Sequence, residues 1–173
     1  MPQNKLVVDA RGEKSRGVDP YTLLHSGDLN GGVVKPIRVT GWRSGNKPTG
    51  DGILWGSPKG SAYGWVEWCL AEEYGDPQKW SQWWVHLDPT ARLFTIDSFS
   101  DLFVLHRRYP SPDRLRLLAM DWPGIACDYD AVWLTEEGQW RTRMTGSLSL
   151  YGWDCESVVV LNHDVIERVE AIP

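Results

Sequence analysis

The chain has 173 residues, of which 42% are hydrophobic and 24% charged, and its formal net charge is −5. This length and composition favour one globular domain with a single core. The negative charge argues against a general nucleic-acid binder, which needs a positive surface, although a local basic patch would still allow a nucleic-acid acceptor.

Residues 1–20 are expected to form a leader or edge segment before one domain at residues 21–173. No stretch is apolar enough to cross a membrane, and the N-terminal segment lacks the apolar core of a signal peptide, so we expect a cytoplasmic protein. Cys69, Cys127 and Cys155 lack zinc-site spacing and are expected to be reduced thiols.

In the first half of the chain, strands are expected at residues 21–25, 36–42 and 53–58. The Gly- and Pro-rich stretch 44–52 is expected to be a loop. From residue 61 the pattern changes: Trp65, Trp68, Cys69 and Glu72 recur at helical spacing before Gly75, which predicts an amphipathic helix.

In the middle of the chain, residues 80–97 are expected to form two strands about a turn at residues 88–89. A helix capped by Ser98 or Ser100 should then run as far as Pro110.

Towards the C-terminus, Asp121 is expected to cap a short helix that carries Pro123 in its first turn. Strands are expected at residues 131–135 and 157–161, with a loop at 136–149 between them. Because strands and helices mix without regular alternation, the pattern favours an α+β fold.

Three short segments combine polar chemistry with tight turns. They read "LLHSGD" around His25, "GILWGSP" followed by "GSAY" around Trp55, and "DCESVVVLNHDVI" around Glu156. Each segment also has an ordinary structural explanation, such as a capping histidine at a strand end or solubilising carboxylates at a strand start.

In this order the three segments resemble the ADP-ribosyltransferase fold family, in particular its small H-Y-E-type mono-ADP-ribosyltransferases. The resemblance covers nearly all of the chain from Tyr21 onward. It implies an α+β domain in which two small, mainly antiparallel sheets and flanking helices form an NAD cleft. NAD would be the co-substrate, and the acceptor of ADP-ribose is left open.

The resemblance makes Glu156 the catalytic glutamate, which hydrogen-bonds the nicotinamide-ribose 2′-hydroxyl and stabilises the oxocarbenium ion of the transition state. Asp154 would help to select or activate the acceptor. Since alternate strand residues share a face, both carboxylates are expected on the same side. A solvated turn aspartate explains Asp154 equally well.

The resemblance also implies three NAD contacts at the first segment. His25 would bind a ribose hydroxyl, and the backbone of Ser26 would pair with the nicotinamide amide. Gly27 would allow the close approach of backbone and ligand.

For stacking on nicotinamide the candidates are Trp55, Tyr63 and Trp65, with Tyr63 preferred because "GSAY" resembles a stretch of the H-Y-E branch. Trp65 also fits the buried face of the expected helix. Ser57 or Ser61 would supply a hydroxyl to the nicotinamide amide.

Two other functions stay open at this point. One is an NAD glycohydrolase on the same fold, and the other is a non-catalytic Trp-rich module that binds carbohydrate or single-stranded nucleic acid. The histidines show no metal spacing, so no metal site is expected. By analogy alone, the small size suggests a bacterial or phage effector, toxin-like or otherwise modifying. Four arginines could bind the NAD pyrophosphate or a nucleic acid, or could be a solvated helix end: Arg107, Arg108, Arg114 and Arg116.

Overall fold

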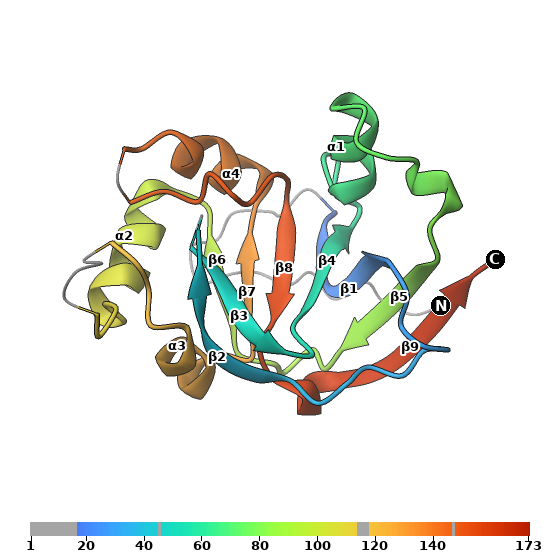
Figure 1. Ribbon diagram of the computed structural model, residues 1–173, viewed down its shortest axis with the longest axis horizontal. Coiled ribbons are helices and arrows are strands. Elements are labelled where there is room, and N and C mark those ends of the chain that lie inside the picture. The colour runs from blue at the N-terminus through green and yellow to red at the C-terminus, as the bar shows by residue number, and fades with distance from the viewer. Residues whose placement is uncertain (1–16, 45, 114–117, 147) are drawn as a thin grey trace.

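The fold is described from a computed structural model that covers residues 17–44, 46–113, 118–146 and 148–173. Within these residues the chain forms a seven-stranded sheet, a separate two-stranded hairpin and four α-helices (Figure 1). The α+β class is therefore confirmed. One large sheet and a hairpin take the place of the two small sheets that we expected. The proposed leader up to residue 16, Arg114 and Arg116 lie outside the described residues.

The centre of the sheet contains three neighbouring strands in the order β8, β4, β1. These are β8 (Ser157–Val160), β4 (Leu54–Lys59) and β1 (Asp19–Ser26), and both pairings are antiparallel. The first strand thus begins two residues before the expected start of the domain.

The remaining strands extend the sheet on both sides. On one side lie β7 (Ala131–Leu134) and β6 (Leu93–Ile96), which form a parallel pair. On the other side lie β5 (Gln82–Leu87) and the edge strand β9 (Ile166–Ile172). The sequence did not indicate β9 as a strand, because three of its seven residues are charged and its apolar residues do not alternate strictly with them; none of the seven is buried.

The stretch 44–52 was expected to be a loop, and this prediction was wrong. β3 (Lys47–Asp51) pairs with β2 (Arg38–Arg43) as an antiparallel hairpin. Pro48 suppressed the strand prediction because proline donates no hydrogen bond to a sheet. In a two-stranded ribbon the proline nitrogen can face away from the partner strand. Asn46 provides the turn with a left-handed φ of 52°.

Three helices agree with the sequence. They are α1 (Trp65–Ala71), α2 (Phe99–Arg108) and α3 (Trp122–Asp128). The side chains of Ser98 and Asp121 cap α2 and α3 by accepting backbone N–H bonds, as their positions predicted.

A fourth helix, α4 (Glu136–Arg143), occupies part of the stretch that was expected to be a loop. Thr135 caps it by accepting the N–H of Gly138. The buried face consists of Gly138, Gln139 and Thr142, so the apolar spacing that marks a helix is missing. A Cβ at Gly138 would lie 2.0 Å from the carbonyl oxygen of Ile96, which explains the glycine at this close approach.

Hydrophobic residues fill both faces of the sheet. Val159 packs with Trp122 beneath the helices, whereas Val158 packs with Leu23 on the opposite face. This alternation within one short strand explains why the segment 158–161 reads as a continuous apolar run.

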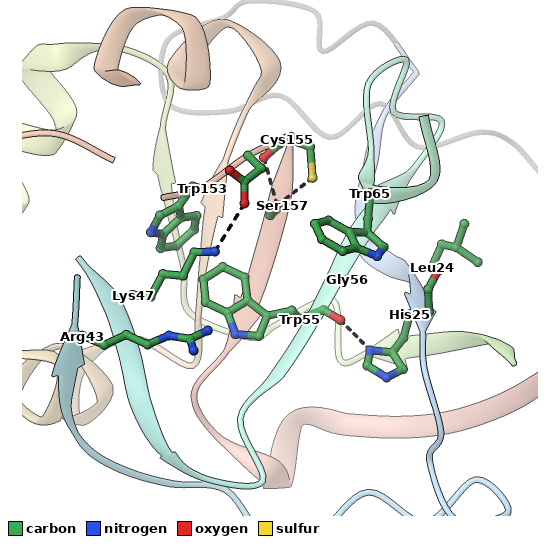
Figure 2. A pocket seen from close by; sticks show the side chains of 12 residues that line it. Leu24, His25, Arg43, Lys47, Trp55, Gly56, Trp65, Trp153, Cys155 and Ser157 are labelled. Atoms are coloured by element: carbon green, nitrogen blue, oxygen red, sulfur yellow. Dashed lines mark hydrogen bonds and ion pairs between the residues drawn. The ribbon is translucent and has the colours of Figure 1, made fainter. Parts of the chain in front are cut away.

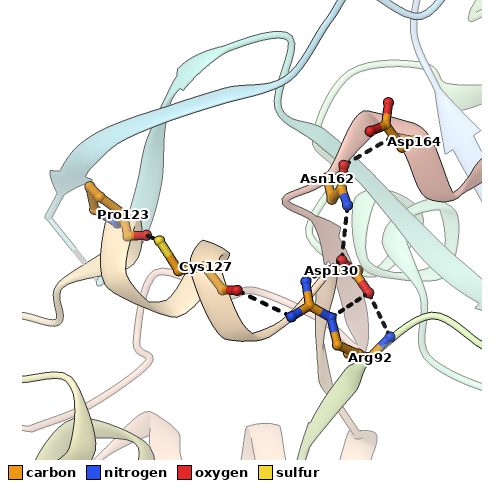
Figure 3. A network of polar contacts seen from close by, with 6 residues as sticks. All are labelled: Arg92, Pro123, Cys127, Asp130, Asn162 and Asp164. Atoms are coloured by element: carbon orange, nitrogen blue, oxygen red, sulfur yellow. Dashed lines mark hydrogen bonds and ion pairs between the residues drawn. The ribbon is translucent and has the colours of Figure 1, made fainter.

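At one end of β6, β7 and β8, a polar network joins three chain segments (Figure 3). Arg92 donates through Nε and Nη2 to the Asp130 carboxylate at 3.0 and 2.8 Å, and Asn162 Nδ2 donates to the same carboxylate at 2.9 Å. Mainly through its bonds to Arg92, this carboxylate has a pKa lowered to about 2. The network lies beyond the C-terminal end of β8, and Glu156 precedes its N-terminal end.

Candidate functional site

The fold places the three motif segments on adjacent strands. His25 lies in β1, Trp55 lies in β4, and Glu156 immediately precedes β8. The pairing is direct: Leu24 lies opposite Ser57, and Trp55 lies opposite Val159. Segments that are far apart in the sequence therefore meet at the centre of the sheet.

A pocket of about 240 Å³ opens over these strands, between the β2–β3 hairpin and α1 (Figure 2). Its lining includes five of the nine site residues expected from the sequence: His25, Ser26, Trp55, Ser57 and Asp154. The other four do not line it: Gly27, Ser61, Tyr63 and Glu156.

His25 is held in one orientation. Its Nδ1 lies 2.7 Å from the carbonyl oxygen of Trp55, so Nδ1 carries the proton and donates. Burial lowers the pKa of His25, and the bond to Trp55 offsets part of that effect. Nε2 is then left as an acceptor, and a Cβ on Gly27 would lie 3.2 Å from it. A neutral histidine with a free acceptor nitrogen suits a ligand hydroxyl.

Three tryptophans line the pocket: Trp55, Trp65 and Trp153 (Figure 2). The ring of Trp55 contacts Trp153 edge-on at 4.6 Å, whereas Trp65 stacks on Trp68 at 4.9 Å. Tyr63, the preferred stacking residue from the sequence, lies outside the lining. Trp65 therefore takes the place at the pocket for which Tyr63 was preferred.

The serines divide into two kinds. Ser57 Oγ accepts the backbone N–H of Trp65 at 2.7 Å and so fixes the start of α1. Ser26 Oγ is buried and has no hydrogen-bond partner among the described residues. Buried hydroxyls normally have a partner, so Ser26 is open to a ligand. The sequence pointed to the Ser26 backbone and gave no signal for its side chain.

Two cations in the pocket were missed by the sequence. Lys47 Nζ lies 3.5 Å from Asp154 Oδ2, and the two side chains are 23% and 27% exposed. Lys47 also lies over the Trp55 ring, 5.9 Å from its centre. Arg43 lies opposite Lys47 on β2 and also lines the pocket. The expected loop at 44–52 hid this pair, which only a hairpin brings together.

Glu156 is only 3% exposed. Its Oε1 accepts the indole N–H of Trp133 at 3.1 Å, and its backbone N–H donates to the Tyr63 carbonyl at 3.1 Å. Burial raises the pKa of Glu156, which the nearby Ser61 hydroxyl and the Trp133 indole lower in part. The Ser61 hydroxyl lies close by but outside hydrogen-bond geometry.

Asp154 and Glu156 do not share a face, contrary to the expectation from alternation. Asp154 faces Lys47 and the pocket, while Glu156 faces Trp133. The reason is that β8 begins only at Ser157. Residues 154–156 form a bend, and the two-residue period of a strand does not apply to a bend.

Cys155, between the two carboxylates, is a neutral thiol. Burial is the main cause that raises its pKa to about 12. Because the thiolate is the nucleophilic form, Cys155 is no candidate nucleophile at neutral pH. All three cysteines are free.

Among the described residues, no three His, Cys, Asp or Glu side chains come together as a metal site. In the same part of the chain, no helix combines the length and apolar character needed to cross a bilayer. Comparisons with protein-family models, curated proteins and solved structures find no match.

Proposed function

We propose that this chain is an NAD-dependent mono-ADP-ribosyltransferase. It would break the bond between nicotinamide and ribose and transfer ADP-ribose to an acceptor. The observation that carries the proposal is the meeting of the three motif segments on β1, β4 and β8 beside one aromatic pocket. The strand order was not used to select these motifs, so it supports them independently.

The pocket suits the nicotinamide end of NAD. Its volume of about 240 Å³ is below the roughly 300–1,000 Å³ of pockets that enclose a whole drug-sized ligand. It would therefore hold the nicotinamide ring and part of the ribose. Trp55 and Trp65 offer faces for stacking, Ser26 Oγ offers an unused hydroxyl to the amide, and His25 Nε2 accepts from a ribose hydroxyl.

Glu156 is the carboxylate that best matches a catalytic role. A buried carboxylate without a cation is costly, and Glu156 has only neutral donors around it, which makes it a candidate for function rather than stability. In the proposed reaction the nicotinamide leaves with the electrons of the C–N bond. The negative charge of Glu156 then stabilises the ribose cation.

For the ribose to reach Glu156, the turn that contains Ser61 and Tyr63 has to move aside. This turn contacts Glu156 through the Tyr63 carbonyl. Asp154 lies at the acceptor side of the pocket, where it would take the proton of the acceptor N–H or O–H as the new bond to ribose forms.

A Trp-rich binding module is less well supported. Such a module needs several exposed tryptophan faces, whereas Trp140 is the one largely exposed tryptophan among the described residues, and Trp122 and Trp153 are buried.

The test is to incubate the purified protein with NAD that is labelled in its adenine and to follow free nicotinamide and labelled products. We expect slow nicotinamide release, with label transferred to an added acceptor. Release of free ADP-ribose alone, whatever acceptor is added, would identify a glycohydrolase instead. No consumption of NAD under any condition would rule out the proposed reaction.

A further inference from the structure

The β2–β3 hairpin and the segment that leads into it are basic, although the chain as a whole is acidic. From Gly31 to the end of β3 at Asp51 there are four basic residues and one acidic one, against a net charge of −5 for the chain. The four basic residues are Lys35, Arg38, Arg43 and Lys47. A local excess of positive charge on an acidic protein indicates a specific anionic partner rather than general attraction.

The tip of this hairpin is held firmly against the body of the protein. The backbone carbonyl of Asn46 accepts the indole N–H groups of Trp122 at 3.1 Å and Trp153 at 3.4 Å. The Asn46 side chain donates to the carbonyls of Leu118 and Ser149. Residues that flank such an anchored turn are preorganised, which lowers the cost of binding a ligand.

Two of the four basic residues reach the pocket. Arg43 and Lys47 both line it (Figure 2), and Asp154 contributes the one carboxylate among the lining residues. Arg43 forms no ion pair with any residue that the structure describes, and Lys47 is only loosely paired with Asp154, at 3.5 Å. The acceptor side of the pocket therefore has an excess of positive charge.

An exposed aromatic ring lies three residues before Asp154 in the chain. Tyr151 is 57% exposed, and the Arg143 guanidinium lies 5.3 Å from the centre of its ring. Aromatic faces interleaved with basic groups are typical of surfaces that bind single-stranded nucleic acid.

We propose that the acceptor is a single-stranded nucleic acid, whose phosphates bind Arg43 and Lys47 and whose bases stack near Tyr151. This inference rests on the proposed transferase function. A duplex fits less well, because a base must leave its stack to enter a narrow pocket. A phosphate at Lys47 also releases Asp154, which then accepts the proton from the attacking N–H or O–H of the base or sugar. The nucleophile bonds to the ribose carbon as nicotinamide departs.

Binding is tested without NAD, by the fluorescence anisotropy of a short dye-labelled single-stranded oligodeoxynucleotide over a range of salt concentrations. Each phosphate contact contributes about −0.7 to the slope of log K against log salt for single strands. We expect the double variant Arg43→Ala, Lys47→Ala to lose about 1.4 of slope, from two contacts. The control is Arg168→Ala, which removes one positive charge from β9, the edge strand four places from β8 in the sheet order. This variant should leave the slope unchanged.

The inference is overturned if the oligonucleotide does not bind, if the slope of the double variant equals that of the wild type, or if only polyglutamate binds. Polyglutamate binding would identify an acidic polypeptide as the partner. Because the assay contains no NAD, its failure is distinct from failure of the transferase reaction. Nicotinamide release without oligonucleotide binding would retain the transferase and reject this acceptor.

Discussion

Two buried carboxylates of this protein are in opposite electrostatic environments. Asp130 is bonded to a guanidinium and has a pKa lowered to about 2. Glu156 has an indole and a nearby hydroxyl but no cation, and burial raises its pKa. Replacing the first should cost stability, whereas the proposed function makes the second a site where stability is given up for catalysis.

The raised pKa of Glu156 makes a prediction about the pH dependence of stability. A group whose folded pKa lies above its unfolded pKa stabilises the fold below the unfolded value and loses that contribution as pH rises through the folded value. Glu156→Gln removes this titration. We therefore expect the melting temperature of the wild type to fall relative to that of Glu156→Gln as the pH rises from about 4 to 7.

Thermal unfolding at several pH values checks this, with Glu170→Gln on exposed strand β9 as the matched control. A constant difference between wild type and Glu156→Gln over this range would contradict the raised pKa.

At this scale the resemblance led us to expect His25 and Trp55 in one cleft, and both line the same pocket. The sequence did not predict the directions of Asp154 and Glu156. The directions of these two side chains depend on the bend before β8, and a bend has no regular alternation from which side-chain directions could be predicted. It also missed Lys47, whose approach to Asp154 is a contact between residues distant in sequence.

At the scale of elements, the sequence was informative where a helix has a cap and an apolar face. α2 satisfies both conditions, and it lies where it was expected. α4 has the cap but buries Gly138, Gln139 and Thr142 instead of apolar residues, and the β2–β3 hairpin contains a proline and several glycines. Tertiary packing overrides local preference in both cases, and a single sequence does not display that packing.

Gly138 is the residue on which the packing of α4 depends. Its replacement by alanine would improve helix propensity in isolation, but the new Cβ would clash with the backbone of Ile96 at 2.0 Å. We expect Gly138→Ala to lower the free energy of unfolding by about 2 kcal/mol, as overpacking does. Chemical denaturation measures this change.

Gly41→Ala is the control, because a Cβ there lies 3.4 Å from the Thr49 hydroxyl, within ordinary contact distance. If Gly138→Ala were as stable as the wild type, α4 would have to sit further from β6 than the structure shows.

At the scale of the whole molecule, the Asp130 network and the site lie at opposite ends of the same strands. Asp130 precedes β7, Arg92 precedes β6, and Asn162 follows β8. The network therefore fixes these three strands relative to one another and supports the register of β8 against β7. The position of Glu156 at the start of β8 depends on that register.

We expect Asp130→Asn to lower the free energy of unfolding by about 2 kcal/mol, the range of hydrogen bonds to charged groups. Because the Asp130 pKa is lowered to about 2 from 3.8, this stabilisation is present above pH 3.8 and is lost as pH falls through about 2. Urea unfolding at neutral and acid pH measures both effects.

Glu137→Gln is the control: it breaks an exposed ion pair with Arg141 and should change the free energy of unfolding little. Equal stability of Asp130→Asn and wild type at pH 7 would contradict this role.

If Glu156 acts on NAD as proposed, its replacement must slow the release of nicotinamide. The comparison uses wild type, Glu156→Gln and the control Glu170→Gln, with folding verified by circular dichroism. We expect release by the wild type and the control, and a loss of about a hundredfold or more in Glu156→Gln. Release by Glu156→Gln at the wild-type rate would mean that Glu156 has no catalytic role.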